Sequence, residues 1–192
     1  MRLTRREQRK LLLRRSVTAA VIIVMILITA ALLQRLASTR MGSSSAPFAA
    51  RPTVVAVIDG DTIDVRIGRN VTRVRLLGID TPETKDPRRP IQCFGPQAAA
   101  RTAELLPRGT IVSLEADRET HDAFGRTLAY VHREDGLFVN LSLLTEGFAD
   151  VLIIAPNHAH SREFRVAAAE AREAPRGLWS ACGGPGRTAG VG

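Results

Sequence analysis

A run of nineteen uncharged residues at positions 16–34 most restricts how this chain can fold. Apolar side chains fill the run, and its length is close to the roughly 20 residues that a helix needs to cross a lipid bilayer. A helix packed on a soluble core would instead show one polar face. The run is therefore predicted to be a transmembrane signal-anchor helix. A buried core helix and a cleaved signal peptide are the alternatives.

Basic residues are concentrated around this run, which predicts its orientation. The formal net charge of the chain is +8, but residues 1–52 carry ten Arg or Lys residues against one Glu, so residues 53–192 sum to −1. Because basic segments stay in the cytoplasm, residues 1–15 are predicted to be a basic cytoplasmic tail. The chain would be a single-pass membrane protein with its domain outside the cytoplasm, and a cleaved secreted form stays open. The high charge is not a sign of a nucleic-acid-binding face.

The remaining boundaries follow from composition. Residues 35–52 are rich in Ser, Ala, Gly and Pro without periodicity, which is typical of a flexible linker. Residues 53–182 then form the predicted folded domain, and the Gly-rich residues 183–192 a disordered tail. No second association surface is evident, so a monomer is expected.

Hydrophobic patterns within the domain predict strands and helices in a fixed order. Three strands at 53–60, 62–68 and 71–79, joined by short turns, form an antiparallel meander. A helix at 95–109, in which Ala99, Ala103 and Leu106 can share a face, is followed by a strand at 110–116 and a hairpin at 126–140. Helices at 141–149 and 160–177 end the domain. This order predicts an α+β fold, a five-stranded OB-fold β-barrel with about three helices.

Carboxylates and arginines stand at the ends of several predicted strands. Asp61, Asp80 and Glu83 lie beside the meander, and Arg75 and Arg126 lie in or before strands. Hard carboxylate oxygens suit Ca²⁺ or Mg²⁺, and the arginine fork matches phosphate oxygens. A cation, a free carboxylate and two arginines could hydrolyse a phosphodiester bond. Taken singly, each residue could instead cap a turn or form a surface ion pair.

The stretches "IDGDT", "RLLGIDTPET", "FGPQA", "DAFGRTLAY" and "GLW" occur in this order. As a set they resemble the staphylococcal nuclease (thermonuclease) family over nearly all of residues 53–179. The resemblance implies an OB-fold barrel and Ca²⁺-dependent cleavage of DNA and RNA to 3′-phosphorylated products. The roles that it implies are Ca²⁺ carboxylates for Asp61 and Asp80, a Ca²⁺-binding backbone carbonyl for Thr81, general base for Glu83, and phosphate binding for Arg75 and Arg126.

The chain departs from the family pattern where nucleotide contacts are expected. Leu152 and Ile154 stand in place of two tyrosines, Phe124 replaces another, and Lys85 is one of few lysines near the site. These four positions remain the expected substrate-binding residues, with a weaker or differently selective grip on the base. The alternative function is a non-catalytic OB-fold nucleic-acid-binding module tethered to the membrane. Retention of the three acids and two arginines favours the enzyme.

Cys93 and Cys182 are the only cysteines of the chain. In an oxidising compartment an isolated pair is expected to form a disulfide, which would join the start of the first domain helix to the end of the last. Two free thiols are the alternative.

Overall fold

A computed structural model describes residues 51–85 and 90–188, which belong to one compact unit, Ala49–Gly192. The predicted cytoplasmic tail, the predicted transmembrane helix and nearly all of the predicted linker lie outside the described residues. Within residues 51–85 and 90–188, no helix is long and apolar enough to cross a membrane.

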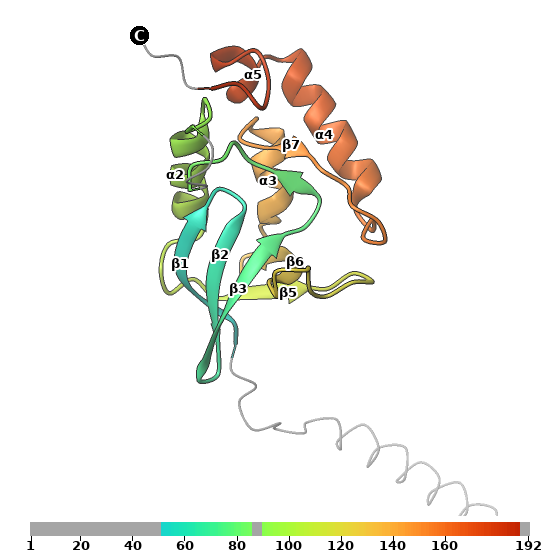
Figure 1. The fold of residues 1–192 in the computed structure, drawn as a ribbon. Coiled ribbons are helices and arrows are strands. Elements are labelled where there is room, and N and C mark those ends of the chain that lie inside the picture. Colours follow the sequence, from blue (N-terminus) through green and yellow to red (C-terminus); the bar gives the residue numbers. More distant parts are fainter. Residues whose placement is uncertain (1–50, 86–89, 189–192) are drawn as a thin grey trace, which may run out of the picture. The chain divides into compact units, whose positions relative to one another are not determined.

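The meander forms as expected. Strands β1 (Thr53–Asp59), β2 (Thr62–Ile67) and β3 (Asn70–Leu76) pair antiparallel. β3 then pairs in parallel with β6 (Thr127–Arg133), and β6 pairs antiparallel with β5 (Val112–Glu115). The sheet order is β1-β2-β3-β6-β5 (Figure 1). In β2, Ile63 and Val65 are fully buried as the alternation predicted, whereas Ile67 at the end of the strand is 40% exposed.

The predicted closed barrel is wrong, because the edge strands β1 and β5 do not pair in this sheet. Their ends are joined by one isolated bridge between Thr53 and Ile111 and by a few backbone hydrogen bonds nearby. A turn at Pro107 leads into this contact. Proline has no N–H to donate, and the Pro107 carbonyl accepts from Thr110 within the turn at 3.0 Å.

The third strand ends earlier than expected. β3 stops at Leu76, and β4 (Ile79–Asp80) pairs with β7 (Asp150–Val151) in a separate two-stranded sheet. Gly78 makes the bend with φ of +76°, and a Cβ there would lie 2.5 Å from the Phe164 ring. Only glycine fits both the backbone and the space. The bend carries Asp80 out of the main sheet.

The described part of the chain has four helices: α2 (Gly95–Leu105), α3 (Val139–Thr145), α4 (Ser161–Glu173) and the short α5 (Leu178–Ala181). α3 packs against both β6 and α4, and α2 against β1. The helix α4 buries Phe164, Ala168 and Ala171 as predicted. The expected second arm of the hairpin at 126–140 is only one bridge, between His132 and Phe138, because α3 begins at Val139.

The buried face of α2 differs from the prediction. Ala103 is exposed, and Thr102 is fully buried instead. A buried hydroxyl must be hydrogen-bonded, and the Thr102 hydroxyl donates to the Gly60 carbonyl at 2.6 Å. This bond fixes α2 against the turn between β1 and β2.

Cys93 and Cys182 form a disulfide, which confirms the predicted pair. The segment after it also contacts the start of the α2 region. The Cys93 amide donates to the Arg187 carbonyl at 2.8 Å, and Thr188 bridges to Gln92. Residues 183–188 therefore differ from the disorder expected for the tail.

Candidate active site

The turn between β1 and β2 presents a buried carboxylate, Asp61. Its Oδ2 accepts a hydrogen bond from the Thr81 amide at 3.0 Å, and its Oδ1 accepts one from the Thr62 hydroxyl at 3.0 Å. Gly60 lies so close to Thr81 that a Cβ there would be 2.6 Å from the Thr81 hydroxyl oxygen. The turn and the loop after β4 are thus packed together, which fixes Asp61 beside Asp80.

Arg75 joins these two carboxylates. Its Nη2 lies 3.1 Å from Asp61 Oδ2 and 3.1 Å from Asp80 Oδ1. Its Nη1 donates to the carbonyls of Leu76 at 2.7 Å and Ile79 at 2.9 Å. The guanidinium is therefore held rigidly by four protein oxygens, in the place where the acids converge.

The electrostatic environment of Asp80 favours another positive charge. Burial raises the pKa of the Asp80 carboxyl, and the neighbouring charge of Asp61 raises it further, while Arg75 partly opposes both. Glu83 and Asp150 also raise it. One arginine is thus too little positive charge for the acids around it.

Glu83 lies in the loop that follows β4, three residues after Asp80. Its Oε1 accepts hydrogen bonds from the backbone amides of Thr84 at 2.9 Å and Lys85 at 2.6 Å. These two amide donors hold the Glu83 carboxylate in place at the edge of the site. The side chain of Lys85 is exposed, and it lines neither the polar cavity nor the apolar groove that are described below.

Arg126 lies directly before β6, next to the turn at Gly125. Asp122 clamps it, because Oδ1 accepts from the Arg126 amide at 2.9 Å and Oδ2 accepts from Nε at 2.6 Å. These hydrogen bonds hold the pKa of the Asp122 carboxyl below its usual value, although burial opposes them. The clamp engages Nε and leaves Nη1 and Nη2 as the donors with which Arg126 can bind an anion.

A polar cavity of about 250 Å³ collects these groups. Six of the predicted residues line it: Arg75, Glu83, Arg126, Asp61, Asp80 and Thr81. Asp59, Thr62 and Gln92 complete the lining and are absent from the sequence-based prediction. Asp59 carried one signal, its spacing of two from Asp61, since such residues share a face in an extended chain.

A second, more apolar groove of about 390 Å³ adjoins the polar cavity. Arg75 and Arg126 line both, and Phe124, Leu152 and Ile154 line only the groove. Phe124 is 84% exposed and Ile154 63% exposed. The structure therefore brings these three predicted substrate-binding residues together beside the two arginines.

The donor set fits a hard cation. The carboxylates of Asp61 and Asp80 converge on one nitrogen, and the hydroxyl oxygen of Thr81 is buried without a partner among the described residues. The two carboxylates and the hydroxyl group offer oxygen atoms, which are the ligands that Ca²⁺ prefers. In residues 51–85 and 90–188, however, no group of three or more His, Cys, Asp or Glu side chains is placed to hold a metal ion. Backbone oxygens and water would have to complete the shell.

Comparison with known proteins gives the family. Residues 73–181 match the family model described as "Staphylococcal nuclease homologue". The chain belongs to the staphylococcal nuclease family. It is 41% identical over 126 residues to the thermonuclease of Staphylococcus intermedius, an alignment that covers 66% of this chain and 74% of that protein.

Two Bacillus subtilis (strain 168) relatives are similar to the same domain. Endonuclease YncB is 40% identical over 133 residues, covering 68% of this chain and 62% of the relative. The SPbeta prophage-derived endonuclease YokF is 41% identical over 130 residues, covering 67% of this chain and 43% of the relative. The chain thus spans less than two thirds of the length of these two endonucleases.

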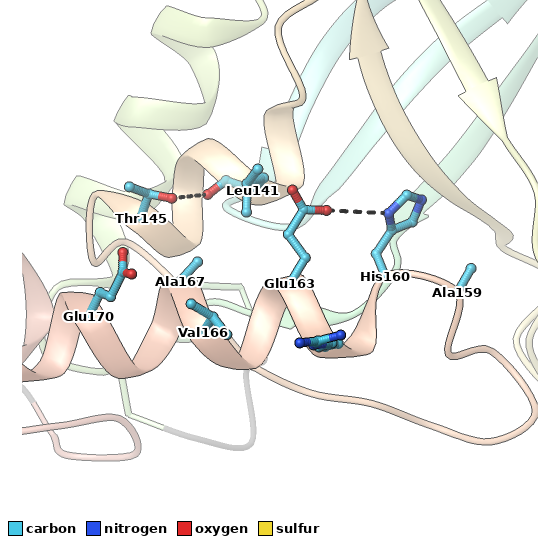
Figure 2. Close-up of a pocket in the computed structure, with 9 residues that line it drawn as sticks. Leu141, Thr145, Ala159, His160, Glu163, Val166, Ala167 and Glu170 are labelled. Atoms are coloured by element: carbon cyan, nitrogen blue, oxygen red, sulfur yellow. Dashed lines mark hydrogen bonds and ion pairs between the residues drawn. The ribbon is translucent and has the colours of Figure 1, made fainter.

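A further cavity of this staphylococcal nuclease domain, about 590 Å³, lies between α3 and α4 (Figure 2). His160 and Glu163 are among its lining residues, and Nδ1 of His160 lies 3.6 Å from Oε2 of Glu163. None of the predicted site residues lines it. It is therefore separate from the candidate active site.

Asp59 should make the metal-free protein less stable as the pH rises. Burial, followed by a hydrogen bond with Glu83, raises the pKa of the Asp59 carboxyl from 3.8 to about 6. The folded state therefore keeps a proton that the unfolded chain has lost, so the free energy of unfolding falls between about pH 4 and pH 6. In chelator, the free energy of unfolding of Asp59→Asn, relative to that of the native protein, is expected to rise by about 2 to 3 kcal/mol between pH 4 and pH 7.

Urea unfolding at a series of pH values measures this difference. Asp64→Asn, at an exposed ion pair of β2, is the matched control and should show no such gain. A constant difference between Asp59→Asn and the native protein from pH 4 to pH 7 would contradict the assignment.

Proposed function

We propose that this chain is a Ca²⁺-dependent nuclease that hydrolyses phosphodiester bonds of DNA, RNA or both outside the cytoplasm. The observation that supports it is the polar cavity, in which four acids and two arginines meet in a member of the staphylococcal nuclease family. The names of relatives at about 40% identity, thermonuclease and endonuclease, agree with this chemistry.

Asp61, Asp80 and the backbone carbonyl of Thr81 would hold the Ca²⁺ ion. When bound, the ion would supply positive charge next to the phosphate that becomes more negative in the transition state. The raised pKa of Asp80, caused first by burial and then by Asp61, is the sign that such a charge is favoured there.

Glu83 would accept the proton of the attacking water. The water oxygen forms a bond to phosphorus as the bond from phosphorus to the 5′ oxygen breaks, which gives a 3′-phosphate and a 5′-hydroxyl. Nη1 and Nη2 of Arg126 would bind the phosphate and the leaving oxygen, which takes its proton from solvent. The N–H groups of Arg75 bind protein oxygens in this structure, and they would also donate to the phosphate.

Glu83→Gln tests the assignment of the base. The full-length protein is incubated with single- and double-stranded DNA and RNA, in Ca²⁺ or in chelator. We expect degradation in Ca²⁺ alone, and a rate about 10²-fold lower for Glu83→Gln, the typical loss for a general base. Glu104→Gln on the exposed face of α2 is the matched control and should keep full activity.

Two results would each contradict one part of the proposal. Tight binding of nucleic acid without cleavage by any variant would favour the membrane-tethered binding module. Activity in Mg²⁺ and none in Ca²⁺ would contradict the metal.

We also propose that residues 16–34 anchor the chain in a membrane as a monomer, with the domain outside the cytoplasm. The basic residues before that segment support this orientation, and so does the disulfide, since such bonds persist in oxidising compartments. Protease added to intact cells should degrade the domain while a cytoplasmic marker survives. Protection of the domain until the cells are lysed would contradict this orientation.

A further inference from the structure

The outer face of the β2–β3 ladder continues away from the catalytic cavity. Directly opposite residues of an antiparallel pair share a face, and the intervening residues Ile63, Val65 and Val74 are buried in the core. The opposite face therefore carries three successive cross-strand pairs: Thr62 with Arg75, Asp64 with Arg73, and Arg66 with Val71. The first pair lines the catalytic cavity, and the other two lead outward from it.

The loop before β6 turns this face into a groove, in which Phe124, Gly125 and Arg126 lie across from the ladder. Figure 1 shows this loop extending from the sheet between β5 and β6. The cavity measures about 480 Å³, and its other lining residues are Asp64, Val71 and Arg73. We call it the β2–β3 groove. Arg126 lines this groove, the catalytic cavity and the apolar groove, so the three adjoin one another at this side chain.

Positive charge predominates along the β2–β3 groove. Arg73 donates to both oxygens of Asp64, from Nε at 2.9 Å and from Nη2 at 3.1 Å. Half of the Arg73 side chain is nevertheless exposed, and Arg66 is exposed one pair further along the same face. An exposed ion pair contributes little to stability. Arg73 can therefore turn its remaining Nη1 donors to a phosphate without disturbing the fold.

Apolar surface flanks these arginines. Val71 is 50% exposed, and the Phe124 ring is 84% exposed, with the Arg126 guanidinium carbon 5.5 Å from its centroid. Phe124 lines the apolar groove and the β2–β3 groove, so it stands between them. Alternation of positive charge with an exposed aromatic ring is the arrangement that binds a single nucleic-acid strand.

We propose that the β2–β3 groove binds the part of a single nucleic-acid strand that extends beyond the scissile phosphate. Arg73 and Arg66 bind successive phosphates, and Phe124 stacks between the base in the apolar groove and the next one. Arg66 on β2 and Arg73 on β3 are diagonal neighbours of the ladder, a relation that spans about 7 to 8 Å and is comparable with one nucleotide of an extended strand. The inference rests on the proposed nuclease function and adds to it a preference for long, unpaired substrates.

Substrates of two lengths test the groove. A dinucleotide fills only the catalytic cavity and its neighbour, whereas a single strand of about a dozen nucleotides also fills the β2–β3 groove. For Arg73→Gln in the full-length protein, we expect KM for the long strand to rise about tenfold, the effect of one lost charged hydrogen bond. The kinetics on the dinucleotide should change less than about twofold.

Salt dependence gives a second readout. The slope of log KM for the long strand against log salt should fall by about 0.7 for Arg73→Gln, and by about 1.4 for Arg73→Gln with Arg66→Gln. Asp64→Asn, which frees Arg73, should lower KM. Arg165→Gln, an equal charge change on the exposed face of α4, is the control and should leave the KM near that of the native protein.

Three outcomes separate the groove from the active site. If Arg73→Gln behaves like Arg165→Gln on the long strand, the groove proposal is wrong. An equal loss on the dinucleotide and the long strand would also overturn it, because Arg73 would then act on the catalytic cavity. If the native protein cleaves neither substrate, the proposed function fails. The affinity of the same variants for the long strand, carrying a fluorescent label, then tests the groove proposal independently of cleavage.

Discussion

Arg126→Ala is expected to lower kcat for nucleic-acid cleavage about 10³-fold, the size of effect found when a charged donor to a transition state is removed. Arg126 is held by Asp122 through its backbone amide and Nε, which leaves Nη1 and Nη2 as donors beside the polar cavity. A rigid fork aimed at the leaving oxygen gains strength as charge develops there. The loss should therefore appear in kcat more than in KM, as single-turnover and steady-state rates would show.

Two variants refine this prediction. Arg126→Lys keeps the charge but not the two parallel donors, and we expect it to recover less than about tenfold of the loss. Asp122→Asn keeps Arg126 but weakens its clamp, so kcat should fall by about tenfold with an unchanged fold. Full activity of Arg126→Ala would remove Arg126 from the mechanism.

Removal of the disulfide is expected to cost about 4 to 5 kcal/mol of the free energy of unfolding. The bond joins Cys93 and Cys182 across 89 residues, so its loss frees a long loop in the unfolded chain. Urea unfolding of the double variant Cys93→Ser, Cys182→Ser beside the native protein measures this cost. Breaking the bond also releases the contact of the Cys93 amide with the Arg187 carbonyl.

Reductant provides the control for this prediction. Added to the native protein, it should reproduce the loss, and added to the double variant it should change nothing. A loss below about 1 kcal/mol in both experiments would mean that the unfolded chain stays compact around the cysteines without the bond.

Local patterns predicted the meander, the helices and the disulfide, because each depends on neighbouring residues or on composition. The alternation along β2 and the buried side of α4 followed from the sequence in this way. The open sheet was not predictable, since it depends on how the turn at Pro107 meets β1, far away in the chain. The break at Gly78 also depends on a distant residue, Phe164.

The gathering of the candidate site residues in one cavity could be predicted from the sequence. Asp61, Asp80, Glu83, Arg75 and Arg126 line one cavity, as their places at strand ends suggested. Asp59 was missed because its closeness to Glu83, a residue 24 positions later, arises only in the folded chain. The burial of Thr102 escaped for the same reason, since the carbonyl that satisfies it belongs to Gly60.

In the proposed nuclease, the small sheet of β4 and β7 would support both the base-contacting residue Leu152 and the ion-binding residue Asp80. Asp80 lies opposite Asp150 in this ladder, and Leu152, in the groove beside the site, donates its amide to the Gly78 carbonyl at 3.0 Å. A base that presses on Leu152 therefore pushes on the strand that carries Asp80. Binding energy from a remote part of a substrate can in this way be used for catalysis. Discrimination between bases would then appear in turnover as well as in affinity.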